Sequence, residues 1–449
     1  MIYFLAAVAA IAGLLFGYDE GVIAVASPSL ARDFPMSPLE HGFTTAAVPL
    51  GALGAAIVTG RLTERFGRRR VLMVAAVLFV AGAIAAAASQ AIWMLMAARF
   101  VLGLAIGVAA VVAPLYIAEC APLRTRGALV STYQLAITIG IVLSYLTGLV
   151  IAGDGSWRIM FALGAVPGLV FLIGLVFLPE SPRWLVLRGR DAEAEASLRR
   201  LRGTSDAAAA ELATIHQVMA AEAGRTGRGD VYAAWVRPAL IVGMGLFFLQ
   251  QLSGINAVIY YAPTIFDYAG LSGGDTQVMA TVGIGVVNLL VTVLAMLLID
   301  RLGRRKLLVI GFAGTGAMLL LIAAAAVWPL VFPAWVVVAA LLGYIAAFAI
   351  SLGPLPHVMM SEVFPLSVRG PGMSMASVSN WGFNFIVVFL FPVMLSGLGL
   401  GVTFALFGVI CLGGIVFTLA RVPETNGLSL ERIEAHLRAG HDLGALRPP

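Results

Sequence analysis

Charged residues are scarce in this 449-residue chain. Lys, Arg, Asp and Glu together make up 11% of it, whereas hydrophobic residues make up 61%. In a soluble globular domain about a quarter of the residues are charged, so the composition excludes that class of protein. Only lipid solvates this much apolar surface. We therefore predict a multi-pass protein of the cell membrane, with the lipid bilayer as its surroundings.

Cysteine is nearly absent, and so are the common motifs of enzymes. The chain has 2 cysteines, Cys120 and Cys411, and their spacing suggests neither a disulfide framework nor a metal site. It also lacks a nucleotide-binding loop and a nucleophile with an assembled base. We expect no enzyme, no metal and no cofactor. The first apolar stretch lacks a basic segment before it, so we interpret it as a membrane span and not as a cleavable signal peptide.

Long apolar stretches are abundant, and each reaches the roughly 20 residues that are needed to cross about 30 Å of hydrocarbon. They predict an all-α membrane protein with twelve transmembrane helices in two halves. The predicted spans are 4–27, 42–62, 70–89, 92–118, 127–152 and 157–178 in the first half, and 238–268, 277–299, 306–328, 334–361, 370–396 and 399–421 in the second.

The net charge of +5 does not indicate a nucleic-acid partner. Most basic residues fall in alternate loops between the predicted spans, which is the pattern of the positive-inside rule. We expect no nucleic acid as a partner, and we predict that both termini are cytoplasmic.

One long polar stretch interrupts the apolar pattern. We predict a six-helix bundle over 1–182, a cytoplasmic helical linker over 183–237, a second six-helix bundle over 238–422 and a cytoplasmic tail over 423–449. In the linker, Leu198 and Leu201, and then Leu212, Ile215 and Met219, recur at helical steps. They predict short amphipathic helices whose apolar stripe faces the membrane domain; the alternative is a flexible solvated linker.

An internal repeat links the two halves, because three motifs occur in the same order in each. The pairs are GRLTERFGRRR (60–70) with IDRLGRRKLL (299–308), a Glu seven positions before an Arg-Gly pair at 119 and again at 362, and PES (179–181) with PET (423–425). Repeated polar motifs between apolar spans predict two similar bundles around a central solute site, which would alternate access by rocking.

Three longer motifs carry a family resemblance. PESPRWL (179–185), QQLSGINAVIYYAP (250–263) and PETNGLSLERI (423–433) closely resemble the sugar porters of the major facilitator superfamily. The resemblance implies the major facilitator fold and transport of a monosaccharide, a hexose or a pentose, by proton symport through alternating access, with a monomer as the functional unit. The alternatives are a facilitative sugar or inositol uniporter and a non-transporting sugar sensor.

Polar amides inside the spans form the candidate sugar site. An amide is costly in hydrocarbon unless it is paired, and it offers both a donor and an acceptor to sugar hydroxyls. By resemblance, these positions match sugar-contacting ones, and Gly254 fits a broken seventh helix. The predicted substrate-binding residues are the amides Gln134, Gln250, Gln251, Asn256, Asn288, Asn380 and Asn384, the aromatic residues Phe16, Phe348 and Trp381, and Tyr260, which shares a helix face with Asn256. The alternative roles are hydrogen bonds between helices and core packing.

His357, in SLGPLPH, departs from the family pattern. Many sugar porters have a tryptophan at this position, beneath the sugar. A smaller ring that can be protonated puts the usual hexose preference in doubt. The two readings are a reshaped pocket floor and a role in proton transfer.

Asp19 and Arg99 are the predicted proton-coupling pair, since both lie inside predicted spans, where a charge is costly unless it is paired or solvated. The resemblance supports this role, because proton symporters carry an aspartate at the Asp19 position. Proximity to Arg99 favours the ionised carboxylate, and separation from Arg99 favours the protonated form. The alternative is a static ion pair that holds two helices together.

The loop motifs predict a cytoplasmic gate. By resemblance, Glu119 contacts Arg68 and Arg126, and Glu362 contacts Arg304 and Arg369, in networks that form in one state and break in another. The remaining predicted gate residues are Glu64, Asp300, Glu180 and Glu424.

Overall fold

The computed structural model describes residues 1–122, 125–151, 156–223, 231–271, 274–365, 368–426, 428, 430–441 and 443–446. Over these ranges the chain forms helices and no β-strand. Eleven helices of the described chain are long and apolar enough to cross a membrane. The last of them, α16, changes direction at Gly399, where φ is 75°, so that it comprises two of the predicted spans. The prediction of an all-α protein with twelve spans is therefore confirmed.

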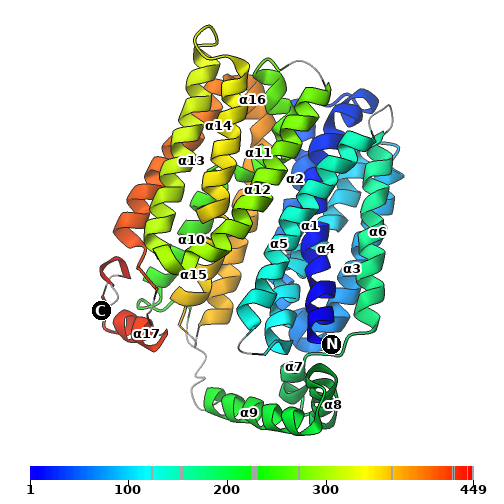
Figure 1. Cartoon of the computed structure of the whole chain (residues 1–449), viewed down its shortest axis with the longest axis vertical. Helices are drawn as coiled ribbons and strands as arrows, with labels where there is room; N and C mark the ends of the chain where they lie inside the picture. The colour runs from blue at the N-terminus through cyan, green and yellow to red at the C-terminus, as the bar shows by residue number, and fades with distance from the viewer. Residues whose placement is uncertain are drawn as a thin grey trace. The chain divides into compact units, whose positions relative to one another are not determined.

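The helices follow the order in Figure 1. The first half has α1 (Ile2–Asp33), α2 (Pro38–Phe66), α3 (Arg68–Ala87), α4 (Ile92–Cys120), α5 (Arg126–Val150) and α6 (Ser156–Val176), followed by α7 (Pro182–Leu187), α8 (Asp191–Arg202) and α9 (Ser205–Ala223). The second half has α10 (Arg237–Leu252), α11 (Ile255–Tyr268), α12 (Gly274–Leu302), α13 (Arg304–Val327), α14 (Ala334–Ala347), the π-helix η1 (Phe348–Leu352), α15 (Leu355–Val363), α16 (Arg369–Arg421), α17 (Leu430–Arg438) and the 3₁₀ helix η2 (Leu443–Ala445).

The chain divides into two compact units. Unit 1 contains Met1–Asp19, Ala47–Leu143 and Gly155–Gly227, and unit 2 contains Glu20–Ala46, Ser144–Asp154 and Arg228–Pro449. Three helices, α1, α2 and α5, therefore contribute residues to both units.

Small residues bring the helices of unit 1 close together. α3 packs against α4 and α6, and a Cβ atom placed on Gly103 of α4 would lie 2.2 Å from the carbonyl oxygen of Val48 in α2. Such backbone approach is how membrane helices associate without a hydrophobic driving force between them. Gly103 is thus required by the packing of α2 on α4.

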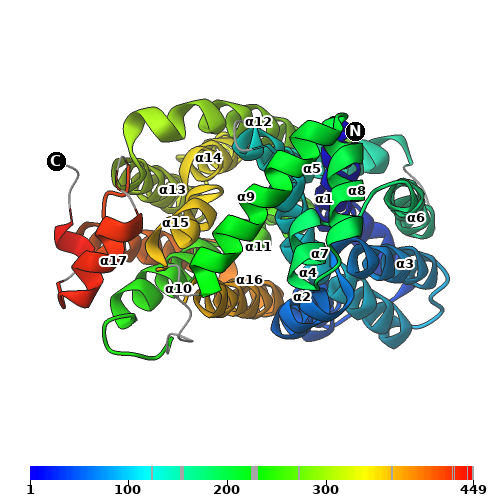
Figure 2. The same cartoon turned by 90° about the horizontal axis from the view of Figure 1, so that it is seen from below.

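The polar linker folds into α7, α8 and α9, which lie together in Figures 1 and 2. As predicted, Leu198 and Leu201 are buried. The stripe of Leu212, Ile215 and Met219 packs against a buried cluster made by Trp184, Leu185, Val186 and Ala194. The apolar face of α9 thus covers α7 and α8, and the expectation that it faces the membrane domain is wrong for this helix. The physical reason is that α7 and α8 present apolar side chains of their own.

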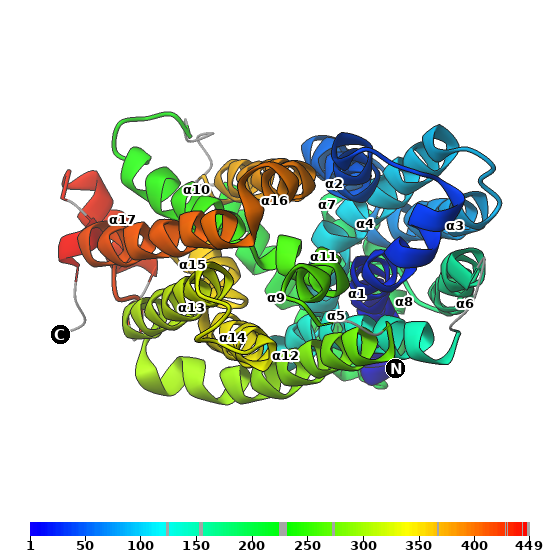
Figure 3. The ribbon, with the colours of Figure 1, turned by 90° about the horizontal axis from the view of Figure 1, so that it is seen from above.

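Unit 2 is irregular where the sequence predicted a break. α10 ends at Leu252 and α11 begins at Ile255, with Gly254 between them at φ 86°. A Cβ atom there would lie 2.6 Å from the Phe407 ring, so both the backbone conformation and the space require glycine. In the view of Figure 3, α13, α14 and α15 form one group in this unit, and α13 packs on α14 and α16.

We predict that Gly103→Ala destabilises the protein, because the added methyl group overpacks the contact between α2 and α4, at a cost of about 1–3 kcal/mol. Gly60→Ala in α2 is the matched control, since a Cβ atom at Gly60 meets nothing within 4 Å. The effect is measured as the thermal unfolding midpoint of the purified variants, with the monodisperse fraction of the protein as the signal. Equal midpoints for the two variants would contradict the packing argument.

Candidate functional site

Asp19 and Arg99 meet in the interior of unit 1. The Nη1 atom of Arg99 lies 3.4 Å from Oδ1 of Asp19, and the two side chains are 0% and 2% exposed. The guanidinium also lies over the Phe161 ring, at 5.7 Å from its centre. The second oxygen of Asp19, Oδ2, is buried and has no hydrogen-bond partner in the described part of the chain. The predicted contact is confirmed, and the described residues supply no partner for the second carboxylate oxygen of Asp19.

Four of the predicted amides form a connected cluster in unit 2. Gln251 Nε2 donates to Asn380 Oδ1 at 2.5 Å, and Asn256 Nδ2 donates to Gln251 Oε1 at 2.8 Å. Gln250 Oε1 lies 3.3 Å from Gln251 Nε2. The break at Gly254 makes this possible, because it lets α10 and α11 direct amides to the same place. The cluster satisfies part of the hydrogen-bonding capacity of these side chains and leaves the remainder for a ligand.

A freed backbone carbonyl anchors Gln250. Its Nε2 atom donates to the carbonyl oxygen of Leu352 at 2.7 Å. Pro356, four residues after Leu352, has no N–H with which to satisfy that carbonyl. The irregular stretch from η1 to α15 therefore holds the first amide of the cluster in place.

Asn384 supplies a further polar atom in unit 2. Its side chain is 2% exposed, and its Oδ1 atom has no hydrogen-bond partner among the described residues. Trp381, three residues earlier on the same helix, is buried, as are Tyr260 and Phe348. Asn288 is half-buried. Buried acceptors without donors are rare in proteins, so Asn384 Oδ1 is a candidate contact for a ligand hydroxyl.

His357 is exposed and packs edge-on against Phe247, with 4.9 Å between ring centres. Its Nδ1 atom lies 3.4 Å from the carbonyl oxygen of Gly353. The two remaining predicted substrate residues, Phe16 and Gln134, belong to unit 1 and are half-buried.

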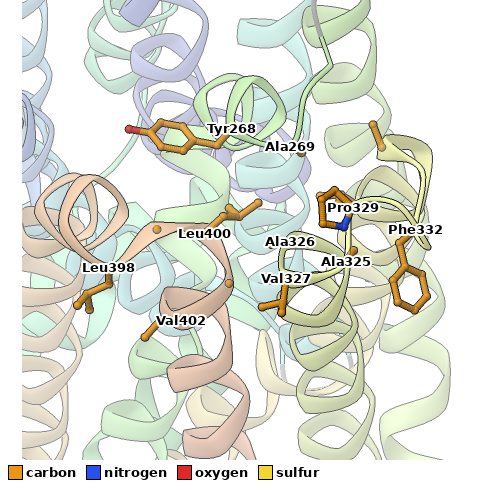
Figure 4. A pocket seen from close by; sticks show the side chains of 14 residues that line it. Tyr268, Ala269, Ala325, Ala326, Val327, Pro329, Phe332, Leu398, Leu400 and Val402 are labelled. Atoms are coloured by element: carbon orange, nitrogen blue, oxygen red, sulfur yellow. The ribbon is translucent and has the colours of Figure 1, made fainter.

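A cavity of about 550 Å³ lies in unit 2 away from the amides. Figure 4 shows it between Tyr268 of α11, the end of α13 and the bend of α16, with Val327 and Leu400 pointing into the region. Its lining is mainly apolar and includes none of the predicted substrate residues. This cavity is therefore not the predicted sugar site.

A carboxylate network lies at one end of unit 1. Arg68 Nη2 donates to Glu119 Oε1 at 2.8 Å, and Ser181 Oγ donates to Glu119 Oε2 at 2.5 Å. Glu180 Oε1 accepts hydrogen bonds from the backbone N–H groups of Arg68, Arg69 and Ser181 at 2.9, 3.1 and 2.9 Å. The Glu180 carboxylate therefore binds the N-terminus of α3, where free N–H groups and the helix dipole favour an anion.

Unit 2 contains a network of the same kind. Arg304 Nη2 donates to Glu362 Oε1 at 3.2 Å, and Thr425 Oγ1 donates to Glu362 Oε2 at 2.6 Å. Glu424 accepts from the backbone N–H groups of Arg304 and Arg305 at 3.0 and 3.1 Å, at the start of α13. The internal repeat predicted from sequence is thus present in the tertiary contacts.

Glycines at equivalent places let each carboxylate approach. Gly67 and Gly303 precede α3 and α13 with φ of 91° and 82°. A Cβ atom on them would lie 2.4 Å from Glu180 Oε2 and 2.7 Å from Glu424 Oε2. Both positions therefore need glycine for conformation and for space.

The remaining predicted gate residues differ in their contacts. Arg126 is exposed and pairs with no acidic residue in the described ranges, and Nε and Nη2 of Arg369 are buried without a partner there. The expected contacts of Arg126 with Glu119 and of Arg369 with Glu362 are therefore not made in this structure. Glu64 takes part through its backbone carbonyl, which accepts from Trp184 Nε1 at 2.8 Å. The side chain of Asp300 lies outside the described residues.

Sequence reasoning missed Ser181 and Thr425, although each holds the second oxygen of a network glutamate. The signal was present, because the two residues occupy the same position in the PES and PET motifs. All of the predicted gate residues were charged, so the hydroxyl residues of these motifs were not among them.

Known proteins resemble the chain over almost its whole length. A family model described as "Sugar (and other) transporter" matches residues 5–437. The probable metabolite transport protein CsbC of Bacillus subtilis is 41% identical over 446 residues, 98% of this chain and 94% of the relative. The galactose-proton symporter of Escherichia coli is 39% identical and covers 99% of this chain and 96% of its own. A solved structure of the xylose transporter XylE from E. coli, in an inward open conformation, has a TM-score of 0.84 and 32% identity, and covers 97% of this chain and 99% of its own.

We predict that Glu180→Ala lowers the free energy of unfolding by about 1–3 kcal/mol, because three backbone N–H groups lose a charged acceptor. Glu195→Ala is the control, since Glu195 makes an exposed pair with Arg199, and such pairs contribute about 0–1 kcal/mol. Thermal unfolding in detergent measures both variants. An unfolding midpoint for Glu180→Ala equal to that of the control would show that the α3 cap does not stabilise the fold.

Proposed function

The chain belongs to the sugar transporter family, and from this we propose that it is a secondary active transporter which carries a monosaccharide across the cell membrane together with a proton. The named relatives include a symporter for a hexose, galactose, and a transporter for a pentose, xylose. Both solutes present hydroxyl groups that an amide cluster can bind. The proposal assigns no catalytic step and no cofactor, and the proton is the coupling ion.

The observation that carries proton coupling is the buried Asp19. Its Oδ1 faces Arg99, while its Oδ2 is buried without a donor among the described residues. An unpartnered carboxylate oxygen in an apolar site is where a proton can bind, since protonation removes the buried charge. A change in the distance between Asp19 and Arg99 during the cycle would then change the affinity for the proton.

The sugar would bind at the amides of unit 2. The cluster of Gln250, Gln251, Asn256 and Asn380 offers donors and acceptors in a fixed arrangement. Asn384 adds an unpartnered acceptor, and Trp381 adds an aromatic ring. By family resemblance we assign Asn288, Tyr260 and Phe348 to this site and His357 to its floor. Phe16 and Gln134 stay predicted substrate-binding residues of unit 1.

We further propose a membrane topology and a gate. The basic motifs at 60–70 and 299–308 would lie on the cytoplasmic side, with both termini, and the end of α11 at Tyr268 would face outward. The division into bundles at 1–182 and 238–422, with a monomer as the functional unit, is part of this proposal. The networks of Glu119 and Glu362 would rearrange as access alternates, and Arg126 and Arg369 would join them in the state that closes the cytoplasmic side.

Asp19→Asn should abolish proton-driven accumulation while sugar exchange persists, because the amide cannot carry a proton. Proteoliposomes that contain the native chain should raise the external pH when a transported sugar is added from a panel of hexoses, pentoses and inositol. Asp267→Asn, at an exposed carboxylate of α11, is the control and should behave as the native chain. Sugar entry without proton movement in the native chain would instead establish facilitated diffusion.

Asn384→Ala should raise the KM for the transported sugar about tenfold, which corresponds to the loss of one buried hydrogen bond of about 1–1.5 kcal/mol. Gln90→Ala, at an exposed glutamine, should leave KM unchanged. Initial rates of uptake over a range of sugar concentrations give both values. An unchanged KM for Asn384→Ala would remove this residue from the sugar site.

A further inference from the structure

Besides the carbonyl of Leu352, prolines free a backbone carbonyl in α11 and another in α16. Pro263 in α11 has no N–H for the carbonyl of Ile259, four residues earlier, and Pro392 in α16 has none for that of Val388. Each carbonyl accepts a tyrosine hydroxyl from another helix instead. Tyr145 of α5 donates to Ile259 at 3.0 Å, and Tyr261 of α11 donates to Val388 at 3.1 Å.

Tyr261 is also the residue at which α11 bends. Its backbone leaves the helical region, at φ −120° and ψ 19°. Its ring stacks on Phe391, with 5.2 Å between centres, and meets the His41 ring edge-on at 5.1 Å. The bend in α11 is thus held from two sides, by α16 and by the first turn of α2.

The start of α2 fixes the position of His41. Ser37 and Glu40 form a capping box around Pro38, in which the Ser37 N–H and hydroxyl donate to Glu40 Oε2 at 2.9 and 2.7 Å. Such a box sets where a helix begins, and it places His41 in the first turn. The Nε2 atom of His41 then shares a hydrogen bond with Ser27 Oγ of α1 at 2.8 Å.

The contact between α2 and α16 in unit 2 is close. A Cβ atom on Gly42 would lie 2.1 Å from the carbonyl oxygen of Phe389, and Phe43 meets the Phe389 ring edge-on at 6.1 Å. The close packing of Gly42 on the backbone of Phe389 therefore fixes the position of the His41 backbone. This position, and not the side-chain rotamer alone, brings the His41 ring to Tyr261.

We propose that Ser27, His41 and Tyr145 form a latch on the bend of α11, and that His41 and Tyr145 are positioning residues which set how often this end of the protein opens. The latch residues all lie in unit 2, yet α1, α2 and α5 continue into unit 1. The inference rests on the proposed function, in which this end faces outward and opens to admit the sugar.

The contacts of the latch suit a reversible closure. They comprise the hydrogen bond from the Tyr145 hydroxyl to the freed carbonyl of Ile259, the edge-on contact between the His41 and Tyr261 rings, and the hydrogen bond between Ser27 and His41. Each is a contact of modest strength that can be broken and remade. Because Pro263 already interrupts the helix, the outer part of α11 can move without losing a backbone hydrogen bond at that point.

Hydrogen exchange measured by mass spectrometry tests the latch without any substrate. In the full chain in lipid nanodiscs, Tyr145→Phe and His41→Ala should each speed exchange over residues 255–268 roughly two- to tenfold, as expected for the loss of one hydrogen bond in an opening equilibrium. Tyr268→Phe, at an exposed tyrosine of the same helix, is the matched control and should change nothing. Unchanged exchange over 255–268 in both latch variants would overturn the proposal, and so would an equal increase over 304–327, which would indicate general destabilisation.

Transport kinetics separate a latch from a purely structural contact. Loss of the latch should increase the fraction of molecules that are open to the outside. The apparent dissociation constant for external sugar falls in proportion to that increase, so Tyr145→Phe should lower KM roughly two- to tenfold. A variant that only folds less well would transport less at the same KM, and that result would overturn the proposal. If no sugar is transported by the native chain, the proposed function fails, while the exchange measurement still decides whether the latch exists.

Discussion

Hydrocarbon offers no hydrogen bonds, so a backbone carbonyl that is released from a membrane helix must find its donor inside the protein. In unit 2 the backbone carbonyls of Ile259, Leu352 and Val388 are among those that face this constraint, because each precedes a proline by four residues. Their donors are Tyr145, Gln250 and Tyr261. The irregular helices are thus stabilised by side chains of neighbouring helices. One of these side chains, Gln250, belongs to the amide cluster, and another, Tyr261, lies at the bend of α11.

The same constraint explains the form of the two glutamate networks. A helix that starts near the membrane surface has free N–H groups, and a carboxylate satisfies several of them at once. Glu180 does this for α3 and Glu424 does it for α13. Because Gly67 and Gly303 admit the carboxylates, the repeated motif is a structural unit of glycine, arginine and glutamate. The proposed role in gating would be additional to this structural role.

Asp19 is the exception among the buried carboxylates, and the proposed proton coupling depends on it. Nearly every other buried carboxylate oxygen described above has a donor, whereas Oδ2 of Asp19 has none among the described residues. The protein accepts the cost of this buried oxygen, and a site that binds a proton in one state and releases it in another requires such a cost. Asn384 Oδ1 is likewise buried without a donor among the described residues.

The sequence by itself determined the class of protein, the twelve spans and the repeat, because apolar length and polar motifs at equal spacing are local properties. The family resemblance of its QQLSGIN motif also predicted the break at Gly254 between α10 and α11. Only the tertiary structure decided which amides touch, which oxygen of Asp19 is unpartnered and which face of the linker helix α9 is covered. It alone showed the hydroxyl groups of Ser181 and Thr425 on the gate glutamates, and His41 on the bend of α11. The contacts of these hydroxyl groups and of His41 with Tyr261 join residues that are 62 to 220 positions apart in the chain. They depend on how helices pack, which no local pattern of residue types encodes.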